Sequence, residues 1–370
     1  MADLAALTMP KLGLAMTEGQ VASWHREEGE TITAGEEIAD IETPKITAAY
    51  ESPAAGTLRR KVVAPGETVP VGALIGVLAE PTAADAEIDA FIAEWQARFA
   101  AEAAEEGPAA LEPEKIETPF GPIQILEGGP AEGKPLVLIH GFGGDLLTFF
   151  LLQPLLAERY RMLALDLPGH GGSTKALPAA ADPAALAAVV GAVMTARGMK
   201  VAHLLGHSLG GAIALALAEA EPARVSALTL VSPAGLGPEI NGDYIAGFIA
   251  ARRPRELTAL LATLFAGGQS LITREMIEGV LRYKRLDGVM AALTAIAAAN
   301  MPEGRQAKSF RHVLMDPARP ARIVWGRQDR IIPATHAEGL PLHVRVNIFE
   351  DAGHMAHMEK AADLARLLGS

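Results

Sequence analysis

Six short, largely apolar runs alternate with helical patterns along the C-terminal two thirds of the chain. The runs occupy residues 136–139, 162–165, 201–205, 225–231, 322–325 and 344–349. Strands that are apolar along their whole length are buried on both faces, as in parallel sheets covered by helices on either side. The sequence therefore predicts a doubly covered α/β domain over residues 117–370.

One long segment interrupts this alternation. Residues from about 236 to 312 are helix-rich and contain many Ala, Leu and Met residues. Because connections of this length inside a compact domain are usually functional, we predict a helical lid over a site. Its apolar side chains are expected to pack the lid rather than to hold a cofactor.

Residues 1–80 contain an internal repeat with an offset of 37 residues. Identical pairs at this offset are Gly19 and Gly56, Gly29 and Gly66, Glu30 and Glu67, Thr31 and Thr68, Gly35 and Gly72, and Ile38 and Ile75. Each half has short strand-like stretches separated by Gly-Glu-Thr turns. The repeat predicts a small all-β domain, residues 1–80, built from two similar halves.

Residues 81–116 differ from both neighbouring regions, because they are rich in Ala, Glu and Pro. Within them Ile88, Phe91, Ile92, Trp95 and Phe99 fall at helical spacing and form one apolar stripe. We interpret the segment as a linker with one amphipathic helix. The stripe is too apolar to remain solvated, so we expect it to dock on the C-terminal domain or on another subunit.

A serine motif follows the third apolar run of the C-terminal domain. The sequence Gly206-His207-Ser208-Leu209-Gly210 lies between that run and a helical pattern, the strand–turn–helix setting that a G-x-S-x-G elbow requires. Asp329 follows the next-to-last run and His354 follows the last one. The chain order Ser208, Asp329, His354 is that of an α/β-hydrolase triad, in which His354 would accept the serine proton and Asp329 would orient the imidazole.

The same region resembles α/β-hydrolases in two further loops. His140-Gly141-Phe142-Gly143-Gly144 follows the first apolar run, and Asp166-Leu167-Pro168-Gly169-His170-Gly171 follows the second. The resemblance implies an oxyanion hole formed by the backbone amides of Phe142 and Leu209.

Other polar residues of the region have simpler interpretations. We expect His140, His170 and His207 to form hydrogen bonds around the site, and Asp166 is a less favourable alternative acid because it follows an early strand. His354 and His357 have the spacing of metal ligands, but no acidic partners complete a set, so we predict no metal site.

Between the two halves of the N-terminal repeat lies Glu42-Thr43-Pro44-Lys45. Together with the flanking glycines, this segment resembles the lipoyl domains of 2-oxo-acid and acetoin dehydrogenase complexes over nearly all of residues 3–80. The resemblance implies that Lys45 carries lipoate in amide linkage after recognition by a lipoylating enzyme. One departure is Pro44, where the family usually has Asp, and proline stiffens a turn.

The whole-chain arrangement resembles the acetyltransferase components of bacterial acetoin dehydrogenase complexes, and the H-x-x-x-D-G motif of other lipoyl-dependent acyltransferases is absent. The resemblance implies acetyl transfer from the lipoyl group on Lys45 to coenzyme A. It also implies thiamine-diphosphate-dependent acetoin-cleaving subunits, a dihydrolipoamide dehydrogenase and a homo-oligomeric core. Two alternatives stay open: a serine hydrolase tethered to a complex by its lipoyl domain, and a non-catalytic lipoyl carrier.

Composition excludes several other classes. The chain of 370 residues has no cysteine, which rules out disulfides, cysteine-ligated metals and a cysteine nucleophile. It has no apolar run long enough to span a membrane, and its N-terminal residues do not have the pattern of a secretory signal. A net charge of −12 without a Lys/Arg cluster disfavours binding to nucleic acid or to an anionic membrane. The expected compartment is the cytoplasm.

Overall fold

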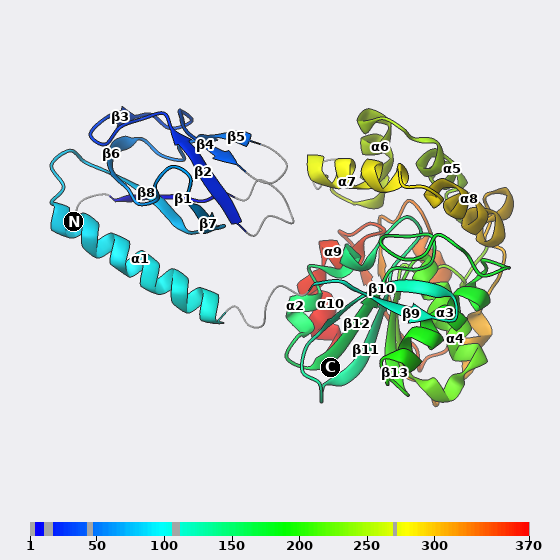
Figure 1. Cartoon of the computed structure of the whole chain (residues 1–370). Coiled ribbons are helices and arrows are strands. Elements are labelled where there is room, and N and C mark those ends of the chain that lie inside the picture. The colour runs from blue at the N-terminus through cyan, green and yellow to red at the C-terminus, as the bar shows by residue number, and fades with distance from the viewer. Residues whose placement is uncertain (1–3, 11–17, 43–46, 106–111, 269–271, 370) are drawn as a thin grey trace. The chain divides into compact units, whose positions relative to one another are not determined.

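A computed structural model describes residues 4–10, 18–42, 47–105, 112–268 and 272–369 (Figure 1). The chain forms two compact units, Met1–Ala109 and Ala110–Ser370. The segment predicted as a linker, residues 81–116, thus contributes a helix to the first unit and the start of a strand to the second. No helix in the described part of the chain is long and apolar enough to cross a membrane.

The N-terminal unit contains two antiparallel sheets of four strands each. One sheet has the order β1 (Ala5–Thr8), β8 (Leu74–Ala79), β6 (Gly56–Lys61), β3 (Thr31–Ile32). The other has the order β5 (Thr47–Glu51), β4 (Glu37–Glu42), β2 (Glu18–Trp24), β7 (Thr68–Pro70). The all-β prediction is confirmed, and the two halves of the repeat contribute strands to both sheets.

The repeat has a physical basis in mirrored turns. Gly29 (φ 93°) and Gly66 (φ 88°) both adopt positive φ, which glycine tolerates better than any other residue. The Gly29 amide donates to the Leu58 carbonyl at 2.7 Å, and the Gly66 amide donates to the Val21 carbonyl at 2.8 Å. Since Val21 and Leu58 are themselves 37 residues apart, each half closes its turn on the other half.

Helix α1 (Asp85–Glu105) packs against the N-terminal unit itself. Ile88 is fully buried beside Val77 and Ala79 of β8, with Phe91, Ile92 and Trp95 partly buried around them. The expectation that this stripe docks on the C-terminal domain or on another subunit is therefore wrong. Every residue of β8 is buried, so this strand needs cover on its outer face, and the helix that follows it in the chain supplies that cover.

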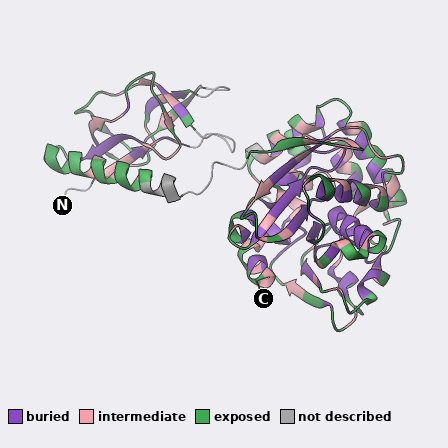
Figure 2. Cartoon of the chain, turned by 60° about the horizontal axis from the view of Figure 1, so that its bottom comes forward, coloured by how far each residue is buried: buried purple, intermediate pink, exposed green. Residues whose placement is uncertain are grey.

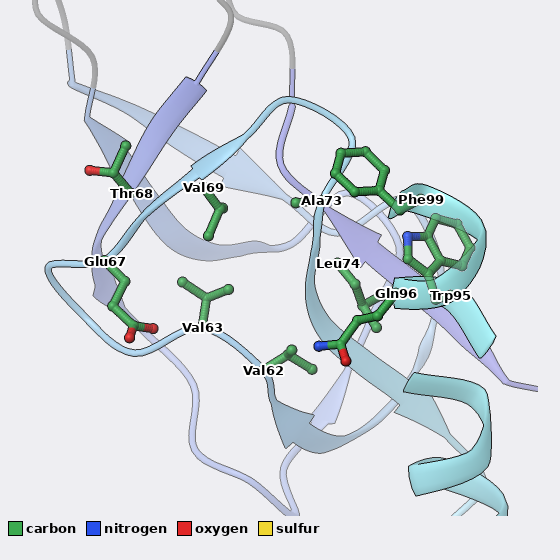
Figure 3. Close-up of a pocket in the computed structure, with 10 residues that line it drawn as sticks. All are labelled: Val62, Val63, Glu67, Thr68, Val69, Ala73, Leu74, Trp95, Gln96 and Phe99. Carbon is green, nitrogen blue, oxygen red and sulfur yellow. The ribbon is translucent and has the colours of Figure 1, made fainter. Parts of the chain in front are cut away.

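The C-terminal half of α1 leaves an open pocket over the same unit (Figure 3). Trp95, Gln96 and Phe99 of the helix face Val62, Val63, Val69 and Leu74, and these residues line a pocket of about 390 Å³.

The C-terminal unit is built on one sheet of eight strands. The order is β16 (Arg345–Phe349), β15 (Ala321–Gly326), β14 (Val225–Val231), β13 (Ala202–His207), β11 (Lys134–Ile139), β12 (Tyr160–Leu165), β10 (Gly121–Gly128), β9 (Glu114–Thr118). The strands from β16 to β12 are mutually parallel, whereas β10 and β9 pair antiparallel at one edge. The α/β prediction is confirmed, and the six apolar runs are the six parallel strands.

Helices cover both faces of this sheet. Helices α3 (Pro183–Ala196) and α4 (Leu209–Ala220) lie on one face, while α2 (Gln153–Leu156), α9 (Ala356–Glu359) and α10 (Ala361–Leu368) lie on the other. Two separate apolar clusters fill these layers, and the sheet strands are among the most buried segments of the unit (Figure 2).

The predicted lid connects β14 to β15. It contains α5 (Gly242–Ala250), α6 (Pro254–Leu261), α7 (Arg274–Lys284) and α8 (Val289–Asn300), which gather beyond one end of the sheet (Figure 1). Buried lid residues such as Phe248, Leu257 and Leu293 belong to the same apolar cluster as α3 and α4. The lid is thus packed onto the domain as part of its core.

Candidate active site

Ser208 occupies a sharp turn between strand β13 and helix α4. Its backbone has φ 52° and ψ −118°, a combination that is sterically unfavourable for a residue with a Cβ. A Cβ on Gly206 would lie 2.3 Å from the Gly210 carbonyl oxygen, and one on Gly210 would lie 2.1 Å from the Ile139 oxygen. Both glycines are therefore required, because the turn packs directly against neighbouring backbone.

The Asp329 carboxylate is buried and has four hydrogen-bond donors. Oδ2 accepts from His354 Nδ1 at 2.8 Å and from Trp325 Nε1 at 2.9 Å. Oδ1 accepts from the amides of Ile331 at 2.8 Å and Ile332 at 3.0 Å. The carboxylate is thus fixed in one orientation and holds the His354 ring by its Nδ1, which leaves Nε2 available for proton transfer.

His207, the residue before Ser208 in the chain, contacts His354. The Nε2–H of His207 donates to the His354 backbone oxygen at 3.0 Å, and the two rings are 4.8 Å apart. Among the described residues no hydrogen bond joins the Ser208 hydroxyl to His354, as is common before a substrate binds. Burial, followed by the charges of His357 and His354, holds the pKa of His207 well below its usual value, so this ring stays neutral.

Two neutral histidines shape the loop that carries Phe142. His140 Nε2 accepts from the Leu167 amide at 3.0 Å, and His170 Nε2 accepts from the Gly143 amide at 3.1 Å. A ring nitrogen accepts only when it is unprotonated, and burial lowers the pKa of both rings. The loop is thereby held against the Asp166–Gly171 segment.

The predicted oxyanion hole consists of the backbone amides of Phe142 and Leu209. In the part of the chain that the structure describes, neither amide donates a hydrogen bond to the protein. Leu209 is the first residue of α4, where amides point out of the helix and the helix dipole favours negative charge.

The contacts of Asp166 and His357 indicate structural roles. Asp166 accepts from the amides of Leu146 and Gly172 at 2.8 and 2.7 Å, so it joins two loops instead of contacting His354. His357 is fully buried between the rings of His207 and Phe149, and burial lowers its pKa to about 3. No group of three or more potential metal ligands exists among the described residues.

The lid reaches the site through Phe248 of α5. Its ring lies 5.9 Å from that of Phe142, and a Cβ on Gly143 would be 2.6 Å from it. Lys284 at the end of α7 donates to the carbonyls of Phe248 and Ala251, and burial lowers its pKa to about 8. Two lid helices are thus joined directly above the Phe142 loop.

Lys45 lies outside the described residues. The strands on either side of it, β4 and β5, are antiparallel, and their last pair is Glu42 with Thr47. The segment containing Lys45 therefore joins two adjacent strands.

Each of the two units matches a known protein family. The family described as "alpha/beta hydrolase fold" matches residues 134–361, and the family described as "Biotin-requiring enzyme" matches residues 5–78. A dihydrolipoyllysine-residue acetyltransferase component of the acetoin cleaving system from Pseudomonas putida is 45% identical over 98% of this chain and 96% of its own length. The chain belongs to this acetyltransferase-component family. The corresponding component from Cupriavidus necator is also 45% identical, over 98% of this chain and 96% of its own length.

Hydrolases also resemble this family member, but they match only about two thirds of its chain. A 2-hydroxymuconate semialdehyde hydrolase from Pseudomonas sp. strain CF600 is 30% identical over 64% of the chain and 86% of its own length. Among solved structures, a meta-cleavage product hydrolase from Pseudomonas fluorescens has a TM-score of 0.63 at 22% identity, covering 70% of this chain and 96% of that one. At this identity the likeness concerns the fold.

Sequence reasoning missed two residues of the site in this acetyltransferase-component fold. Trp325, at the end of β15, is fully buried and donates to Asp329. A buried indole N–H needs an acceptor, so a tryptophan four residues before an acidic residue was a usable signal. Phe248 had no such signal, because its contact with Phe142 depends on how the lid folds back.

Proposed function

We propose that the chain transfers an acetyl group from S-acetyldihydrolipoyl-Lys45 to coenzyme A, with Ser208 as the acyl acceptor in between. The proposal rests mainly on one observation: a single chain contains both a lipoyl-type domain and a serine site. In that site His354 and Asp329 form a hydrogen bond of 2.8 Å. The relatives from P. putida and C. necator, which match nearly the whole chain, are named as dihydrolipoyllysine-residue acetyltransferase components.

The proposed reaction consists of two acyl transfers, the first to Ser208 and the second to coenzyme A. The lipoyl group would supply the thiol that brings the acetyl group to the site as a thioester. Ser208 Oγ attacks the thioester carbon while His354 Nε2 takes the hydroxyl proton and returns it to the departing thiol. The thiol of coenzyme A then attacks the acyl-serine, His354 takes the thiol proton, and the proton returns to Ser208 Oγ as acetyl-CoA leaves.

Developing negative charge on the carbonyl oxygen needs two donors. The amides of Phe142 and Leu209 are free among the described residues, and we assign them this role. Each such donor contributes about 2.7–4 kcal/mol to transition-state stabilisation in comparable sites. The packed lid, with Phe248 against Phe142, would exclude water, because hydrolysis is the competing fate of the acyl-serine.

The acetyl group must come from another enzyme, and the reduced lipoyl group must be reoxidised. We therefore infer thiamine-diphosphate-dependent acetoin-cleaving subunits and a dihydrolipoamide dehydrogenase as partners, with a lipoylating enzyme for Lys45 and a homo-oligomeric core. The relatives are named as components of the acetoin cleaving system, which supports assembly into a complex. We place the complex in the cytoplasm.

The direct test offers acetyl-dihydrolipoamide to the full-length protein with and without coenzyme A, and measures acetyl-CoA and acetate separately. The proposal predicts acetyl-CoA as the main product and at least a thousandfold loss of it in Ser208→Ala. Ser309→Ala, an exposed serine of the same domain, is the matched control and should retain full activity. Mass mapping of a lipoyl group to Lys45 in protein from a lipoylating host tests the carrier site.

A hydrolase tethered by its lipoyl domain is the second candidate. It is favoured by the 30% identity of the C-terminal unit to a 2-hydroxymuconate semialdehyde hydrolase. Acetate released at the same rate with and without coenzyme A, and no acetyl-CoA, would establish this candidate. Normal acetyl-CoA formation by Ser208→Ala would instead favour a non-catalytic carrier.

A further inference from the structure

The lid differs in charge from the rest of the chain. Residues 236–312 contain ten Lys/Arg and seven Asp/Glu, whereas the whole chain contains 32 and 44. The lid thus carries a net positive charge on a strongly acidic protein. A local excess of one sign concentrates ligands of the opposite sign at that surface.

The basic residues come from two short segments that meet at Lys284. Its Nζ donates to the Ala251 carbonyl at 2.6 Å and also to the Phe248 carbonyl, which ties the end of α7 to the end of α5. Arg252 and Arg253 follow Ala251 directly, and Arg285 follows Lys284 directly. The segments 252–255 and 282–285 therefore lie together at one edge of the lid.

Four of the guanidinium groups in these segments have no ion pair within 4 Å among the described residues. Arg253, Arg255, Arg282 and Arg285 are exposed. Within the described ranges no salt bridge involves any of them. By contrast, Arg274 at the other end of α7 is paired with Glu278 at 2.7 Å.

Glu256 follows the first segment directly, and its carboxylate is engaged by backbone amides. The Glu256 carboxylate accepts from the amides of Arg252 at 2.9 Å and Arg253 at 3.2 Å, where it caps the start of α6. Hydrogen bonds from these amides hold the pKa of Glu256 below its usual value. Its carboxylate also attracts Arg253 and Arg252 but forms no ion pair with either of them among the described residues.

This edge adjoins helix α5, which contacts the loop of the proposed oxyanion hole. Phe248 contacts Phe142, and the basic segment begins four residues after Phe248. Coenzyme A carries its thiol at one end of an extended pantetheine arm and its three phosphates on the nucleotide at the other end. A thiol at Ser208 would thus leave the phosphates outside the lid, where planar guanidinium groups bind phosphate oxygens in pairs.

We propose that Arg253, Arg255, Arg282 and Arg285 form the site for the nucleotide phosphates of coenzyme A at the edge of the lid. The assignment rests on the proposed function, because it takes coenzyme A to be the acyl acceptor. It separates recognition of the nucleotide from the chemistry at Ser208, so an acceptor without the nucleotide should be insensitive to these arginines.

The test compares full-length protein with the double variant Arg253→Gln/Arg285→Gln. Calorimetric titration with coenzyme A should give a Kd about tenfold or more higher in the variant, with weaker dependence on salt. In transfer assays, the ratio of kcat/KM for coenzyme A to kcat/KM for pantetheine should fall by a similar factor. Arg274→Gln, on the same helix but at its paired end, is the matched control and should leave both the Kd and the ratio unchanged.

The outcomes separate the two proposals. An unchanged Kd for coenzyme A overturns the assignment, and so does an equal loss with coenzyme A and pantetheine, which would mean that the arginines act on the lid fold. Weaker binding of coenzyme A in the double variant supports the assignment even where no acetyl-CoA is formed. The absence of acetyl-CoA in that case contradicts the proposed function instead.

Discussion

The indole N–H of Trp325 and the imidazole of His354 donate to the same oxygen of Asp329, at 2.9 and 2.8 Å. Trp325 Nε1 also lies 3.0 Å from the Ile332 carbonyl oxygen. The tryptophan is fully buried, so water cannot replace it as a donor. It is therefore a positioning residue that withdraws charge from the carboxylate and fixes its rotation.

Replacing Trp325 with Phe keeps the ring and removes the donor. The Asp329 carboxylate then loses one of the hydrogen bonds that fix its rotation, so it holds the His354 ring less firmly. We expect kcat/KM to fall about tenfold, the equivalent of one modest hydrogen bond. Trp95→Phe, in the N-terminal unit, is the control, and a lower Tm with an unchanged kcat/KM would contradict the assigned role.

Much of this site could be predicted because its parts are local in sequence. Ser208 is recognisable from the glycines that its turn requires, and Asp329 and His354 from their positions after two apolar strands. The Trp325 donor and the Phe248 contact depend on how distant segments meet. The docking of α1 was mispredicted for a related reason: its stripe was visible in the sequence, whereas the uncovered face of β8 was not.

Gly210→Ala should disrupt the turn at Ser208. The added Cβ would lie 2.1 Å from the backbone oxygen of Ile139, a contact that only a shift of α4 can relieve. We expect a loss of at least a hundredfold in kcat, because a displacement of about 1 Å is enough for such a loss, together with a lower Tm. Gly279→Ala in α7 is the matched control. Its Cβ would meet nothing within 4 Å, so the variant should be slightly more stable.

His357 should make the C-terminal unit sensitive to acid. Burial lowers its pKa from 6.5 to about 3. At pH values between these two, His357 is protonated in the unfolded chain and neutral in the folded chain. Stability is therefore lost as pH falls below about 6.5, by about 2 kcal/mol between pH 7 and pH 5 for this residue. The lowered pKa values of His140, His170 and His207 act in the same direction, whereas the raised pKa values of Asp145 and Asp166 oppose it.

The difference between wild type and His357→Phe isolates this contribution. Urea unfolding of both proteins at pH 7 and pH 5 should show a smaller loss of stability in the variant, by about 2 kcal/mol. The comparison uses the change with pH, so any packing cost of the phenyl ring cancels. His312→Phe, at an exposed residue paired with Glu219, is the control. Equal losses in wild type and His357→Phe would show that this histidine does not titrate as inferred.

Ile88→Ala should weaken the attachment of α1 to the N-terminal unit. The side chain is fully buried against β8, and removing it leaves a cavity that costs about 2–4 kcal/mol. Hydrogen exchange of the β8 amides should accelerate, because the helix protects this strand. Glu94→Ala, at an exposed residue of the same helix, should leave exchange unchanged. If β8 exchanges at the same rate in Ile88→Ala and wild type, the helix does not dock on this strand in solution.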